Sequence, residues 1–169
     1  MELELKSISM AGVAEANAKA EHYRLLNQPK EAESICHDVL ATDAENQLAL
    51  RNLGLAITDQ FVGSPADRYA EVEAAFSRLT DPYERLYYTG ILHERRAKAQ
   101  LAAGRSPHTQ FVTVEEAMRC FKEAEAIRPR GNDDPILRWN SCIRLLKSHS
   151  DAEWHRDTET VDVGDSHSF

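Results

Sequence analysis

The sequence predicts an all-α protein of about seven helices, and three observations support this fold class. Helix-capping residues recur along the chain, often followed by a proline in the first helical turn. Apolar residues then repeat at intervals of three and four, which is the period of a helix buried on one side. Alternation with a period of two is confined to the first few residues, which are too short to require a sheet.

Five of the seven helices are predicted from a start signal of their own, and the first two are predicted without one. The apolar pattern predicts two helices over about 11–26 and 29–41. Asp43, Ser64-Pro65 and Asp81-Pro82 precede the next three, which contain AENQLALRNLGLAI, ADRYAEVEAAFSRL and RLYYTGILHERRAKAQLA. The stretch Thr113-Val114-Glu115-Glu116 has the form of a capping box, so the sixth helix is expected to start there, after a long loop over 103–112. Asp134-Pro135 opens the last helix, ILRWNSCIRLLK.

Gly54 lies in the middle of the third helix, where glycine costs about 1 kcal/mol relative to alanine. The surrounding Leu50-x-x-Leu53-Gly54-x-Ala56-Ile57 resembles the first helix of a tetratricopeptide repeat, whose pattern is W-x2-L-G-x2-Y. Gly90 follows 36 residues later in a looser copy, Leu86-x2-Thr89-Gly90-x2-His93. Ala117-x3-Phe121-x2-Ala124 followed by Pro129 fits the second helix of the family. The sequence therefore resembles this family across roughly residues 13–146.

The resemblance implies a right-handed superhelical array of antiparallel helix pairs, an α-solenoid, with a C-terminal capping helix at 135–148. Three pairs are the preferred number within a range of two to four. The small residue of each first helix would lie where the second helix crosses closely, and a glycine that only weakens a helix is the alternative. Trp139, Ile143 and Leu146 would cover the last core face.

The same resemblance implies a concave groove, lined by the first helices of the pairs, that holds a peptide or helix of a partner protein. The side chains expected to be exposed there are Arg24, Arg51, Leu55, Tyr87, Ile91, Glu94 and Arg95. Arginine and tyrosine are common anchors of interfaces, although ordinary solvated positions would have the same composition. The clamp that grips a terminal carboxylate in some family members is a poor match, since Glu84 stands where a basic residue is wanted.

Charge, composition and motifs argue against several classes of protein. A net charge of −8 argues against a dedicated nucleic-acid binder. The amino terminus lacks the features of a signal peptide, and no stretch has the length and apolarity of a membrane span, so we expect a cytoplasmic protein without membrane contact. Three separated cysteines suggest neither a disulfide framework nor a zinc site. No catalytic motif occurs, and His93 is expected to be a structural residue, so we expect no enzyme activity, cofactor or metal.

The expected domains are an N-terminal extension (1–10), the helical repeat domain (11–148) and an acidic, disordered tail (149–169). Residues 83–148 carry 12 basic and 8 acidic side chains, whereas the tail carries one and six. The tail could fold back and dock Trp154 or Phe169 in the groove, or could remain solvated.

The function predicted from these observations is a non-catalytic protein-binding module, such as an adaptor, scaffold or assembly chaperone. A regulatory subunit of a separately encoded enzyme is the alternative, and a self-contained enzyme comes third. The identity of the partner is not encoded in any motif of the chain.

Overall fold

A computed structural model describes residues 3–149 of the chain, and every regular element in this range is a helix. The fold class predicted from the sequence, all-α, is therefore confirmed for the described residues. A short 3-10 helix, η1 (Met10–Gly12), leads into seven α-helices. These are α1 (Val13–Leu25), α2 (Pro29–Thr42), α3 (Gln47–Thr58), α4 (Tyr69–Ser77), α5 (Pro82–Ala102), α6 (Pro107–Ile127) and α7 (Asp134–Ser148). The expected tail, except for His149, lies outside the described residues.

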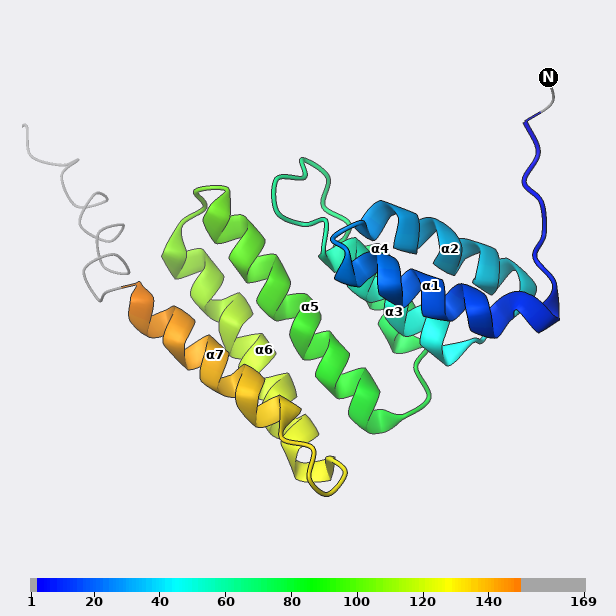
Figure 1. The fold of residues 1–169 in the computed structure, drawn as a ribbon. Helices are drawn as coiled ribbons and strands as arrows, with labels where there is room; N and C mark the ends of the chain where they lie inside the picture. The colour runs from blue at the N-terminus through cyan, green and yellow to red at the C-terminus, as the bar shows by residue number, and fades with distance from the viewer. Residues whose placement is uncertain (1–2, 150–169) are drawn as a thin grey trace, which may run out of the picture.

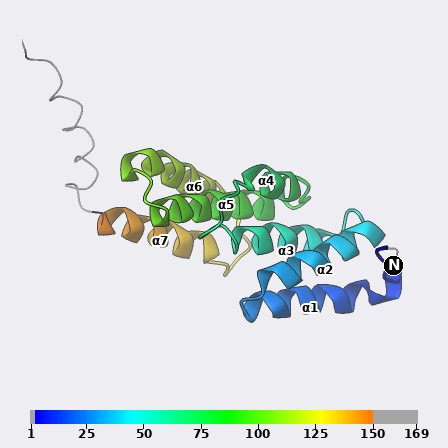
Figure 2. The same ribbon diagram turned by 90° about the horizontal axis from the view of Figure 1, so that it is seen from above.

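The helices follow one another in space as they do in the sequence (Figure 1). Each helix packs against the next, and α3 also contacts both α1 and α5. Seen from above, α1 and α6 lie at opposite edges of the molecule, and α7 flanks α5 (Figure 2). Each of the helices α1, α3 and α5 contacts the helix that follows it, and we call α1/α2, α3/α4 and α5/α6 pairs, with α7 after the last of them.

Two glycines allow close crossings within these pairs. A Cβ atom built on Gly54 of α3 would lie 2.2 Å from Cε1 of Phe76 on α4. A Cβ atom built on Gly90 of α5 would lie 2.6 Å from Cε1 of Phe121 on α6. Both distances are far shorter than a carbon–carbon contact of about 3.5–4.0 Å. The expectation that Gly54 lies at a close crossing is confirmed, and Gly90 has the same role.

The core follows the row of helices. One buried cluster joins α1 to α5 and contains Leu50, Ile57 and Phe76, and a second joins α5, α6 and α7 around Phe121. Leu55 and Tyr88 are partly buried and pack against both clusters, so the two cores are continuous. Cys36, Cys120 and Cys142 are buried and free. Burial raises the pKa of the Cys36 and Cys142 thiols to about 12.

Three predicted helix starts are wrong. The third helix is capped by Asn46, not by Asp43, because the Asn46 side chain accepts a hydrogen bond from the backbone N–H of Ala49. The fourth starts at Tyr69, since the chain from Ser64 to Arg68 is still loop.

The sixth helix starts at Pro107, so the predicted long loop is short and the Thr113–Glu116 stretch lies inside the helix. Gln110 and Val114 are buried there and extend the core-facing stripe toward Pro107. By contrast, Asp81 caps α5 as predicted, accepting a hydrogen bond from the N–H of Tyr83 at 2.8 Å.

Candidate protein-binding face

The seven predicted groove residues lie on α1, α3 and α5, and we call the surface that these helices form with α7 the first-helix face. Asp59, the residue that follows the end of α3, joins two of the predicted arginines. Its Oδ2 accepts a hydrogen bond from Nε of Arg24 at 2.8 Å, and its Oδ1 contacts Nη1 of Arg95 at 2.5 Å. Arg95 also donates to Oγ1 of Thr58 and to the backbone carbonyl of Leu55. Asp59 therefore connects α1, α3 and α5.

A second ion pair connects α3 and α5. Nη1 of Arg51 lies 2.9 Å from Oε1 of Glu84, and its guanidinium carbon lies 5.9 Å from the centroid of the Tyr88 ring. Both charged side chains keep about a quarter of their surface exposed, at 28% and 25%. Glu84 argued against a carboxylate clamp in the sequence, and in the structure it forms an ion pair with Arg51.

Tyr87 belongs to an aromatic cluster in the first two turns of α5. Its ring stacks on Tyr83 at 5.8 Å, meets Tyr88 edge-on at 5.1 Å and lies 5.9 Å from Phe121. Burial raises the pKa of Tyr83 to about 12, while its hydroxyl accepts a hydrogen bond from Asn132. Tyr87 is only partly buried, so it contributes an aromatic surface to the first-helix face.

Two predicted groove residues are not exposed, so this part of the prediction is wrong. Ile91 is 1% exposed and belongs to the core around Phe121. Glu94 is fully buried because α7 covers this side of α5. Its carboxylate contacts three groups, namely Lys98 at 2.5 Å, Arg138 at 3.4 Å and Ser141 at 3.4 Å.

Three contributors to this face were missed by the sequence analysis, namely Asp59, Lys98 and Arg138. The contact of Lys98 could have been predicted from the sequence, because Lys98 follows Glu94 by four residues and this spacing favours a pair on one helix. The contacts of Asp59 and Arg138 could not, since their partners are 36 and 44 residues away in the sequence.

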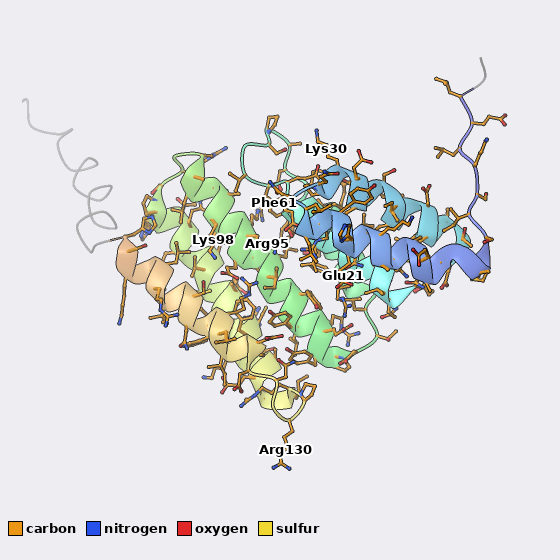
Figure 3. All side chains as sticks on the ribbon, viewed as in Figure 1. Glu21, Lys30, Phe61, Arg95, Lys98 and Arg130 are labelled. Carbon is orange, nitrogen blue, oxygen red and sulfur yellow. The ribbon has the colours of Figure 1, made fainter. Side chains whose placement is uncertain are left out.

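A hollow lies outside the first-helix face, beside the loop between α3 and α4. A cavity of about 170 Å³ separates this loop from the second half of α5, with Phe61 and Arg68 among the residues that line it. Arg68 pairs with Glu33 at 2.5 Å, and Arg96 pairs with Asp67 at 2.9 Å while lying 4.4 Å from the Tyr69 ring centroid. Two of the three arginines that line this cavity, Arg68 and Arg96, are therefore already paired within the protein, and the third is Arg105. Figure 3 shows Phe61 at the loop, Lys30 near the start of α2 and Arg95 lower on α5.

His93, expected from the sequence to be a structural residue, is half-buried, with its ring 5.9 Å from that of Tyr69. Burial lowers the pKa of its imidazole. Within residues 3–149, no three His, Cys, Asp or Glu side chains are grouped so that they could hold a metal ion. None of the described helices combines the length and apolarity needed to cross a membrane.

Comparison with known proteins identifies no relative: no family model matches the chain, and no curated protein or solved structure matches it.

Proposed function

We propose that the chain is a tetratricopeptide-like array, with its helix pairs in a right-handed superhelix and α7 as the cap. The two glycine crossings support this assignment, because the family resemblance implied a small residue at this place in each first helix. The contacts of α3 with α1 and α5 also support it, since stacked repeats bury each unit against its neighbours.

We further propose that the protein is a non-catalytic, cytoplasmic binding module that holds a polypeptide segment on the first-helix face. One observation carries this proposal: charged and aromatic side chains on three successive first helices are partly exposed and already fixed by one another. Arg24, Arg51 and Arg95 keep 18%, 28% and 24% of their side-chain surface exposed. Side chains that are ordered before binding lose less conformational entropy when a partner arrives.

Site-specific photo-crosslinking tests the proposal with probes placed outside these interactions. A benzophenone amino acid replaces Glu21, an exposed residue one turn before Arg24 on α1 (Figure 3), or Lys122, an exposed residue of α6. Circular dichroism checks that each variant is folded. The proposal predicts that Glu21 captures a discrete partner protein that Lys122 does not capture, and that Arg95→Ala reduces the yield.

Two results would contradict this assignment. Capture of the same proteins in equal yield from both positions would show that the first-helix face has no preference. Capture of a discrete partner from Lys122 alone would place binding on the opposite helices.

A further inference from the structure

The second half of α5 and the adjacent helix α7 are rich in positive charge. Between residues 94 and 109 and between residues 135 and 149, the only acidic side chain is Glu94. Four cations of these segments define what we call the α5–α7 basic surface. They are Lys98, Arg138, Arg144 and Lys147.

The charge of this surface is only partly balanced by the rest of the described chain. Lys98 and Arg138 share the single carboxylate of Glu94, which is buried between them. Arg144 and Lys147 are exposed and form no ion pair with any residue in the range 3–149. The surface therefore has a net charge of about +3, which attracts negative charge over a Debye length of about 10 Å at 0.1 M salt.

The contacts of Glu94 place the two helices side by side. Because Lys98 and Ser141 both approach Oε1 of this carboxylate, the middle of α7 lies next to Lys98. Ser148 ends α7 seven residues beyond Ser141, which is about 10 Å further along a helix. Figure 3 shows Lys98 in the second half of α5.

The chain continues from this point with a strongly acidic segment. Residues 150–169 contain six acidic side chains and one basic side chain, Arg156. We infer that this segment binds the α5–α7 basic surface of its own chain. Ten residues cover about 15 Å even in a helix, so the segment that begins at Asp151 is long enough for its acidic residues to reach Lys98. Covalent attachment also favours this occupant over a separate acidic protein, because an intramolecular ligand has a high effective concentration.

Zero-length cross-linking of the full-length protein tests the inference. A carbodiimide joins a lysine amine to a carboxylate in direct contact, and mass spectrometry identifies the linked peptides. We expect links from Lys98 to acidic residues of 150–169 at low salt. Their yield should fall about fivefold at about 0.5 M salt, because exposed charge pairs are screened. Lys122, an exposed lysine of α6, is the internal control and should give no such links.

Two further arms make the test decisive. Arg144→Glu/Lys147→Glu should lower the yield at Lys98 severalfold, whereas Lys19→Glu/Lys30→Glu, with the same charge change on exposed residues of α1 and α2, should not. An equal mixture of ¹⁵N-labelled and unlabelled protein separates links within one chain from links between chains. Links found only between chains, an equal yield at Lys122, a yield insensitive to salt, or the absence of links at Lys98 would each overturn the inference.

Discussion

The pairs α3/α4 and α5/α6 have the same contact between a glycine and a phenylalanine, but their helices differ in length. In both, a glycine of the first helix faces a fully buried phenylalanine of the second, Phe76 or Phe121. In α5/α6, each helix has 21 residues, and the two pack along much of this length. In α3/α4 the second helix has only nine residues, so the crossing accounts for a larger share of the contact between the two helices.

Polar contacts compensate for the short length of α4 at both of its ends. Before its first residue, Arg68 binds Glu33 of α2 at 2.5 Å. Beyond its last residue, Arg78 pairs with Glu45 at 2.8 Å, and Gln47 accepts a hydrogen bond from the N–H of Thr80. A tight crossing together with anchored ends can thus replace a long helix.

Of the substitutions considered, Gly54→Ala is expected to lower the free energy of unfolding most. The new methyl group would meet three ring atoms of Phe76 at 2.2–2.8 Å, and this ring is fully buried. Overpacking costs typically about 1–3 kcal/mol, and the better helix propensity of alanine returns about 1 kcal/mol. Because the distances are so short, we take the upper end of the overpacking range and expect a net loss of about 2 kcal/mol in the free energy of unfolding, measured by urea denaturation.

Phe76→Leu is the matched test of the cause. Combined with Gly54→Ala, the smaller side chain should make the double variant more stable than the two separate losses predict, by about 1 kcal/mol. Strictly additive losses would show that the methyl group and the ring do not compete for the same space.

Gly90→Ala should cost less, about 1 kcal/mol, since the closest ring atom of Phe121 lies 2.6 Å from the added carbon. The comparison between the two pairs depends on this order. If Gly90→Ala proves more damaging than Gly54→Ala under the same conditions of urea denaturation, then the long helices are less able to adjust than the short one, and crossing distance does not determine the cost.

The smallest effect concerns the anchoring of α4 and depends on pH. The hydrogen bonds from Arg68 lower the pKa of the Glu33 carboxyl group, against the opposing effect of its partial burial. Because the pKa is lower in the folded state, this stabilisation is complete above the pKa of the unfolded chain and is lost as the pH falls through the folded value.

Glu33→Gln should therefore flatten the loss of stability below about pH 5, with a change of about 1 kcal/mol or less for a pair of this exposure. Urea denaturation from pH 6 to pH 3 measures it. Glu31→Gln, an exposed residue of the same helix, is the control and should leave the slope unchanged. Equal slopes for the Glu33 variant and the unmodified protein would contradict the anchoring role.

The sequence was sufficient to predict the fold class and the two crossings because both depend on local signals. Periodic apolar residues and first-turn prolines identify helices, and a glycine within such a pattern indicates a close approach. Gly54 and Phe76 were nevertheless not paired in advance, since the loop between α3 and α4 alters the family spacing. The starts of α4 and α6 were misplaced because each segment offered a plausible cap at the wrong residue.

The composition of the first-helix face was harder to predict. Helical period alone places Glu94 on the same side of α5 as Tyr87, but it does not reveal that α7 covers one part of this side and leaves the other partly open. That depends on Arg138 and Ser141, which meet Glu94 only in the folded chain. Long-range ion pairs have no fixed spacing in the sequence, so Asp59 could not be identified as the residue shared by Arg24 and Arg95.

The close crossing of paired helices at glycine is tested most directly by solution NMR. We expect nuclear Overhauser effects between the α-protons of Gly54 and the ring protons of Phe76, and likewise between Gly90 and Phe121. The glycine α-protons should also show ring-current shifts, which disappear at Gly54 in the Phe76→Leu variant and persist at Gly90. Unshifted α-protons without such effects, in a protein that remains helical by circular dichroism, would contradict the account.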